Sequence, residues 1–169
     1  MKINNNLILI GMMASGKSTI GRLLAKKLKL RFYDTDFIIE KKTKMKIYEI
    51  FKKKGETEFR NLEEKITLKL LKKSNCVISL GGGAFLNNKI RRVVQNSGTS
   101  ICLDWSHKTI INRIKKNNKR PIALNLTSNE IKDLIINRSK IYSEAKYNIN
   151  CENMTKLEIL NKIIEMLKL

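Results

Sequence analysis

Apolar positions fall into short continuous runs that alternate with longer stretches of helical spacing. Runs such as "LILI" (7–10) and "CVISL" (76–80) are typical of buried strands, whereas Phe59, Leu62, Ile66 and Leu70 recur at steps of three and four. We also predict strands at "RFYD", "SICLDW" and "YNINC", and helices over 17–27, 36–42, 47–54, 56–73, 87–96, 108–116, 130–145 and 155–167. This alternation predicts an α/β fold whose parallel sheet is covered by helices on both faces.

Length and composition indicate one globular domain over 1–169, with 42% hydrophobic residues to supply its core. No apolar run approaches the roughly 18 residues that a membrane helix needs, so we expect a soluble, cytoplasmic protein without membrane partners. The three cysteines, Cys76, Cys102 and Cys151, are far apart and form no metal-type or redox-type pair. We interpret them as reduced, mostly buried thiols.

The net charge of +20 raises the question of a nucleic-acid partner. The basic residues, however, are spread over nearly every predicted helix, and aromatic residues make up only 6% of the chain. A dedicated nucleic-acid face would cluster the charges and interleave aromatic side chains. We therefore expect no dedicated nucleic-acid function, and a positive field that attracts anionic ligands.

The stretch "GMMASGKST" (11–19) contains the complete G-x-x-x-x-G-K-[ST] pattern between a predicted strand and a predicted helix. Backbone N–H groups of residues 14–18 would surround a phosphate, and the helix N-terminus adds its positive dipole end. Lys17 supplies charge to the outer phosphates and Ser18 a hydroxyl for Mg²⁺. The predicted nucleotide-binding residues are Ala14, Ser15, Gly16, Lys17, Ser18 and Thr19. The motif predicts that the protein binds a nucleoside triphosphate and transfers or hydrolyses its terminal phosphoryl group.

Two carboxylates follow the second predicted strand. Asp34 and Asp36 are two positions apart in "DTD", so on an extended segment they would point the same way. One could then support Mg²⁺ while the other holds a substrate hydroxyl and accepts its proton. The alternative for Asp36 is a helix N-cap before "FIIEKK". A guanine-nucleotide switch would need N-K-x-D, which "NNKR" near position 118 lacks.

Four arginines have two interpretations each. Arg60 either pairs with nearby glutamates or clamps a substrate carboxylate with its planar guanidinium. Arg120, beside the only proline, is either a solvated loop residue or a lid residue that closes on the transferring phosphate. Arg113 is either surface charge or a flat partner for a nucleotide base, and Arg138 has the same ambiguity between surface charge and a site role.

Together, "GMMASGKST", "FYDTD", "GETEFRNLEE", "ISLGGGA", Arg120-Pro121 and "NRSKIY" come in the order and spacing of one family. In these motifs the chain resembles the shikimate kinases. The resemblance implies a five-stranded parallel P-loop kinase fold, a substrate-binding region near 36–62 and a lid near 117–130. It also implies transfer of the γ-phosphoryl group of ATP to the 3-hydroxyl of shikimate, in aromatic amino-acid biosynthesis.

The resemblance further implies a role for each matching residue. Asp36 corresponds to the base that binds the ring hydroxyls, and Asp34 to the support of Mg²⁺ with Ser18 as ligand. Lys17 and the lid residue Arg120 would stabilise the transferring phosphate. The remaining matches are Arg60 and Arg138 on the shikimate carboxylate, Arg113 beside adenine, Glu63 ordering the arginines, and Gly81, Gly82 and Gly83 in the shikimate pocket.

The glycine triplet has a physical rationale, because a backbone without Cβ allows a rigid hydroxylated ring to approach closely. Its N–H groups would then meet the hydroxyls and carboxylate of the ring. Two alternatives stay open: another small P-loop kinase acting on gluconate or a nucleoside monophosphate, and a P-loop binding module or RNA-associated protein. We expect a monomer that takes ATP, Mg²⁺ and shikimate.

Overall fold

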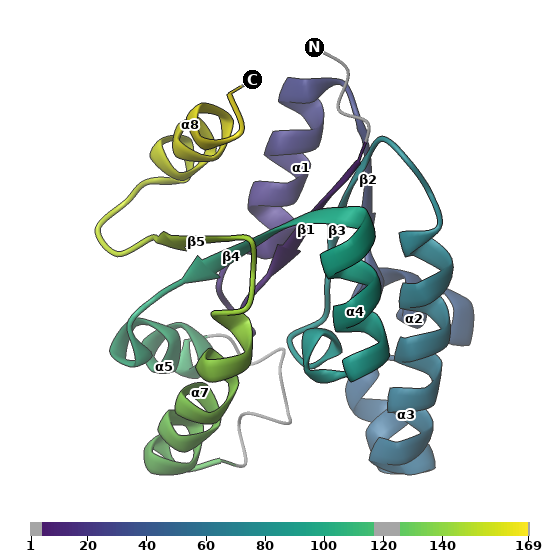
Figure 1. The fold of residues 1–169 in the computed structure, drawn as a ribbon. Helices are drawn as coiled ribbons and strands as arrows, with labels where there is room; N and C mark the ends of the chain where they lie inside the picture. The colour runs from purple at the N-terminus through teal and green to yellow at the C-terminus, as the bar shows by residue number, and fades with distance from the viewer. Residues whose placement is uncertain (1–4, 117–125, 169) are drawn as a thin grey trace.

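The computed structural model describes residues 5–116 and 126–168, apart from the side chain of Ser97. Its centre is a five-stranded sheet in the order β2-β3-β1-β4-β5, in which every neighbouring pair is parallel (Figure 1). This confirms the predicted five-stranded parallel sheet. The strands are β1 (Asn6–Ile10), β2 (Arg31–Asp34), β3 (Cys76–Ser79), β4 (Gly98–Asp104) and β5 (Tyr147–Asn150).

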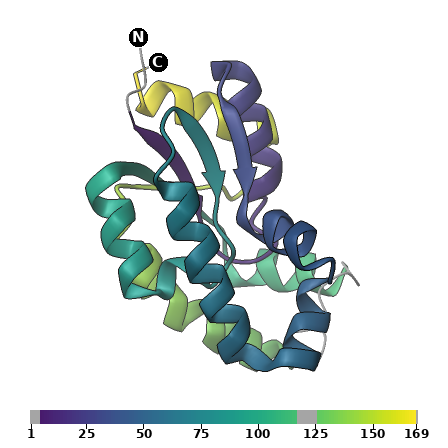
Figure 2. The ribbon, with the colours of Figure 1, turned by 90° about the vertical axis from the view of Figure 1, so that its right-hand side faces the viewer.

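Helices connect the strands and cover both faces of the sheet, as Figures 1 and 2 show from two sides. The connections follow the predicted alternation, and the predicted helix ends agree with the structure within a few residues. The helices are α1 (Lys17–Leu28), α2 (Thr35–Thr43), α3 (Ile47–Leu71), the 3-10 turn η1 (Ala84–Leu86), α4 (Asn88–Ser97), α5 (His107–Lys115), α7 (Ser128–Tyr142) and α8 (Lys156–Met166).

Alternation along the central strand β1 divides the core into two parts. Leu7 and Leu9 pack with α1 and α8 on one face, whereas Ile8 and Ile10 pack on the other face with residues of α3, α4, α5 and α7. All four side chains are at most 2% exposed. A strand covered on both faces is therefore apolar throughout, and β1 accordingly forms a continuous run of apolar residues in the sequence.

Gly55 divides α3 into two helical segments. Its φ of 79° and ψ of 171° are not helical, and glycine adopts them without a Cβ penalty. The break separates the two helices predicted over 47–54 and 56–73. The second segment carries Arg60 and Glu63 toward the carboxyl ends of the strands, where ligands bind in open parallel sheets.

The three cysteines are free and buried, as predicted. No helix in the described ranges is long and apolar enough to cross a membrane.

Candidate active site

The phosphate-binding loop connects β1 to α1 at the carboxyl edge of the sheet. Gly11 and Gly16 have φ values of 134° and 92°, and a Cβ on Gly11 would lie 2.8 Å from the Leu103 carbonyl oxygen. The Lys17 side chain is 7% exposed, and its Nζ donates to the carbonyl oxygens of Gly11 at 2.9 Å and Met12 at 2.7 Å. The loop thus holds its lysine within the curve of its own backbone.

A cavity of about 510 Å³ opens beside this loop. It brings together most of the predicted nucleotide-binding residues, both predicted carboxylates and one of the predicted arginines. Its lining is Ala14, Gly16, Lys17, Ser18, Thr19, Asp34, Asp36, Ser79, Leu80, Arg113 and Lys116. A lysine and hydroxyl groups of the kind found at phosphate sites therefore share one space with two carboxylates.

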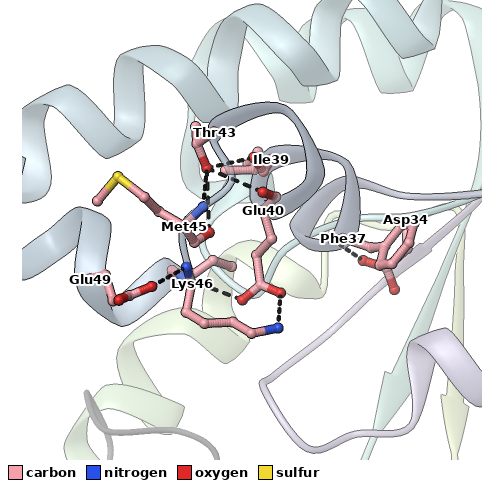
Figure 3. Close-up of polar contacts among 9 residues, drawn as sticks. Asp34, Phe37, Ile39, Glu40, Thr43, Met45, Lys46 and Glu49 are labelled. Carbon is pink, nitrogen blue, oxygen red and sulfur yellow. Dashed lines mark hydrogen bonds and ion pairs between the residues drawn. The ribbon is translucent and has the colours of Figure 1, made fainter.

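Asp34 has two functions in the structure, one for each carboxylate oxygen. Its Oδ1 accepts a hydrogen bond from the Phe37 N–H at 3.2 Å and so caps α2 (Figure 3), while Oδ2 accepts from the Ser18 hydroxyl at 2.5 Å. The cap is thus Asp34, and the alternative that Asp36 caps this helix is wrong. The extended geometry expected for "DTD" is also wrong, because α2 already begins at Thr35.

The Ser18–Asp34 pair fits the requirements of Mg²⁺. Both side chains line the cavity, and they present a hydroxyl and a carboxylate oxygen 2.5 Å apart. Mg²⁺ prefers such oxygen ligands and keeps several waters beside substrate phosphates. Among the described residues, no group of three or more His, Cys, Asp or Glu side chains is arranged to hold a metal ion.

The corner between α2 and α3 is fixed by polar contacts (Figure 3). Glu40 accepts from the Lys46 ammonium and from the Ile47 N–H, both at 3.1 Å. The Thr43 hydroxyl donates to the Ile39 carbonyl oxygen at 2.8 Å, and Glu49 accepts from the Lys46 N–H at 2.7 Å. These bonds hold the end of α2 and the start of α3 in a fixed arrangement within the region predicted over 36–62.

The glycine triplet lies against four of the predicted site side chains. A Cβ on Gly81 would lie 2.5 Å from Asp36 Oδ1 and 2.7 Å from Glu63 Oε1. A Cβ on Gly83 would lie 2.3 Å from Arg60 Nη1. The atoms that exclude a Cβ thus belong to the protein itself, so the triplet leaves room for these side chains.

A Cβ on Gly82 would lie 3.8 Å from Arg138 Nη1. The Arg138 Nη1 donates to the Gly82 carbonyl oxygen at 3.3 Å, and its buried Nε has no partner within the described residues. The Tyr142 hydroxyl donates to the same carbonyl oxygen. The Gly81 N–H donates to the Thr35 hydroxyl at 2.7 Å, so this N–H is already used within the protein.

Arg60 forms ion pairs with both glutamates considered in the sequence. Its Nη2 lies 3.1 Å from Glu56, and its Nη1 lies 2.7 Å from Glu63. Glu63 is only 3% exposed. Burial raises the pKa of Glu63 above its ordinary value, as does the charge of Asp36, against the opposing effect of Arg60. This carboxyl therefore orients Arg60 from inside the protein.

Arg113 lies at the cavity wall, packed flat on Trp105. The centre of its guanidinium is 3.6 Å from the indole ring centroid, and Nη1 donates to the Ala14 carbonyl oxygen at 3.4 Å. The Trp105 indole donates to the Ser15 carbonyl oxygen at 2.9 Å. Arg120 and most of the predicted lid, 117–125, lie outside the described residues.

Three residues at the site were missed by the sequence reasoning: Thr35, Tyr142 and Trp105. Thr35 and Tyr142 stand inside quoted motifs, and their hydroxyls bond to the glycine triplet. Trp105 follows β4 and gave no signal of its own, since only the fold brings it to a loop 90 positions away. A polar side chain between two candidate residues was the available signal for Thr35.

A phosphate loop that shares its cavity with two carboxylates at the edge of this parallel sheet defines the class of P-loop small-molecule kinases. The shikimate kinase family model matches residues 13–168. A shikimate kinase of Persephonella marina is 42% identical over 159 residues, which cover 94% of this chain and 96% of that protein.

Solved structures give the same assignment. The shikimate kinase of Acinetobacter baumannii, solved in complex with shikimate, has a TM-score of 0.93 at 30% identity and covers 99% of this chain and 94% of its own. The shikimate kinase of Aquifex aeolicus has a TM-score of 0.86 at 37% identity, with 96% of each chain covered. The chain belongs to the shikimate kinase family, and it is an ATP-dependent kinase.

Proposed function

We propose that this chain transfers the γ-phosphoryl group of ATP to the 3-hydroxyl of shikimate, giving shikimate 3-phosphate and ADP in aromatic amino-acid biosynthesis. The observation that carries the proposal is the set of side chains around the glycine triplet. A carboxylate, Asp36, lies at Gly81, while the guanidinium groups of Arg60 and Arg138 lie at Gly83 and Gly82. This arrangement matches an acceptor that has a hydroxyl group at one end, facing the carboxylate, and a carboxylate at the other end, facing the two guanidinium groups.

Each group has a separate task in the proposed reaction. The loop N–H groups and Lys17 bind the phosphates of ATP, and Ser18 and Asp34 hold Mg²⁺, which neutralises phosphate charge when bound. Asp36 accepts the proton of the attacking hydroxyl as the new O–P bond forms and the bond to the ADP oxygen breaks. Arg60 and Arg138 hold the acceptor carboxylate, since a guanidinium forms two parallel hydrogen bonds to it.

We propose a single domain over 1–169, with the acceptor bound by the region 36–62 and a lid over 117–130 that brings Arg120 to the transferring phosphate. Arg113 is proposed to contact adenine. We further propose a cytoplasmic monomer without a nucleic-acid or membrane partner.

The acceptor is tested by ADP release from purified protein with ATP and Mg²⁺, in the presence of shikimate, gluconate or AMP. The proposal expects release that is stimulated by shikimate alone. Stimulation by gluconate or AMP, but not by shikimate, would assign a different acceptor to the same fold.

Two variants test the assigned roles in the same assay. Asp36→Asn should retain ATP binding and lose most turnover, because an amide does not take up the hydroxyl proton; turnover at the wild-type rate would remove Asp36 as the base. Arg138→Lys should chiefly raise the KM for shikimate, because lysine lacks the planar fork. An unchanged acceptor KM would remove Arg138 from the site.

A further inference from the structure

We propose that Trp105 is a positioning residue for the adenine nucleotide, acting through Arg113 and through the phosphate loop. Trp105 is the first residue after β4, and its half-buried side chain packs against both parts of the core. Its indole is therefore held by the body of the fold. The proposal rests on the proposed function of Arg113 as the contact of the adenine base.

The first contact of the indole orients the guanidinium of Arg113. A separation of 3.6 Å between the guanidinium carbon and the ring centroid is that of two stacked planes. The long arginine side chain would otherwise sample many rotamers on the surface of α5. Stacking fixes one face of the guanidinium against Trp105 and leaves the other face available to a second flat group.

The position of Arg113 indicates which flat group this is. Arg113 lines the same cavity as Lys17 and Ser18, and its Nη1 also donates to the Ala14 carbonyl oxygen. A nucleotide whose phosphates lie in the loop would extend its base along this cavity wall. The base would then complete a stack in the order indole, guanidinium, adenine.

The second contact of the indole acts on the phosphate loop itself. The indole N–H donates to the Ser15 carbonyl oxygen at 2.9 Å. A trans peptide holds its C=O and N–H on opposite sides, so the Gly16 N–H in the same peptide is directed away from the indole. Trp105 thereby stabilises the loop geometry in which N–H groups converge on a phosphate.

The two contacts make separable predictions for two ligands, ADP and inorganic pyrophosphate. Trp105→Phe keeps an aromatic face but removes the N–H, so both ligands should bind about threefold more weakly. Trp105→Leu removes both contacts. Its Kd for ADP should therefore be about three to ten times that of Trp105→Phe, whereas its Kd for pyrophosphate should equal that of Trp105→Phe.

Isothermal titration of each variant with both ligands measures these constants. Phe32→Leu is the matched control, because it also removes an aromatic ring beneath an arginine, Arg22 at 5.8 Å, on the α1 side of the sheet. The proposal is overturned if Trp105→Leu weakens ADP and pyrophosphate by the same factor, if neither affinity changes, or if Phe32→Leu gives the same ADP-selective loss.

A second measurement needs no Trp105 variant, in case these do not fold. Trp105 is the only tryptophan of the chain, so its fluorescence reports on this position alone. ADP should change the emission more than pyrophosphate does, and Arg113→Ala should remove the difference. An equal response to both ligands in the wild-type protein would contradict the proposal. Neither measurement includes an acceptor, so a failure to phosphorylate shikimate would be seen separately.

Discussion

Replacing Gly81 by alanine should slow the reaction strongly while leaving the fold intact. The new Cβ would lie 2.5 Å from Asp36 Oδ1, whereas ordinary contact begins at about 3.4 Å, so the carboxyl must move by about 0.9 Å. A displacement of about 1 Å in a reacting group costs on the order of 100-fold in rate. We therefore expect kcat to fall about 100-fold, which corresponds to about 2.7 kcal/mol of lost transition-state stabilisation.

The stability of Gly81→Ala should change little, because the atoms that must move are side-chain ends and the φ of Gly81 lies outside the left-handed region. The assay combines ADP-release kinetics with a thermal melt. Gly83→Ala is the comparison variant, since its Cβ would meet Arg60 at 2.3 Å and should raise the KM for shikimate more than it lowers kcat. A folded Gly81→Ala protein with kcat within threefold of wild type would refute the reasoning.

Three further predictions concern buried polar groups. Thr35→Val leaves the Gly81 N–H without its acceptor and should cost about 1–3 kcal/mol in denaturant unfolding, whereas Thr35→Ser should not. Because the pKa of Glu63 is raised, its contribution to stability is lost as pH rises through that pKa. The stability of wild type relative to Glu63→Gln should therefore fall as the pH rises from the ordinary carboxyl range through the raised pKa of Glu63, and a difference that stays constant with pH would contradict this. Burial raises the pKa of the Cys102 and Cys151 thiols to about 12. Ellman's reagent should therefore react with these two thiols only after the protein unfolds. Rapid labelling of both thiols in the native protein would contradict this prediction.

The strands and the phosphate loop could be predicted because their signals are local. Buried parallel strands are apolar throughout, and the loop is a contiguous motif between a strand and a helix. The start of α2 is harder to predict from the sequence than the strands, because Asp34 and Asp36 are both plausible N-caps. Which one caps the helix depends on the position of Ser18, whose hydroxyl holds the other oxygen of Asp34.

The contacts that shape the site were beyond the sequence because they join distant segments. The triplet 81–83 indicates that Cβ atoms are excluded, but only the fold shows that Asp36, Glu63 and Arg60 exclude them. The Trp105 indole and the Ser15 carbonyl oxygen are 90 positions apart and meet only because β4 pairs with β1.

The parallel order β2-β3-β1-β4-β5 has a consequence for how the enzyme regains activity after denaturation. Ile10 on β1 pairs with Cys102 on β4, and Leu9 pairs with Ser79 on β3, so the strands around the site are joined across long stretches of chain. Such non-local pairings form slowly, whereas helices form early from local contacts. During refolding, the circular dichroism signal of the helices should recover first. Phosphoryl transfer should return only when the last strand has paired in its native register.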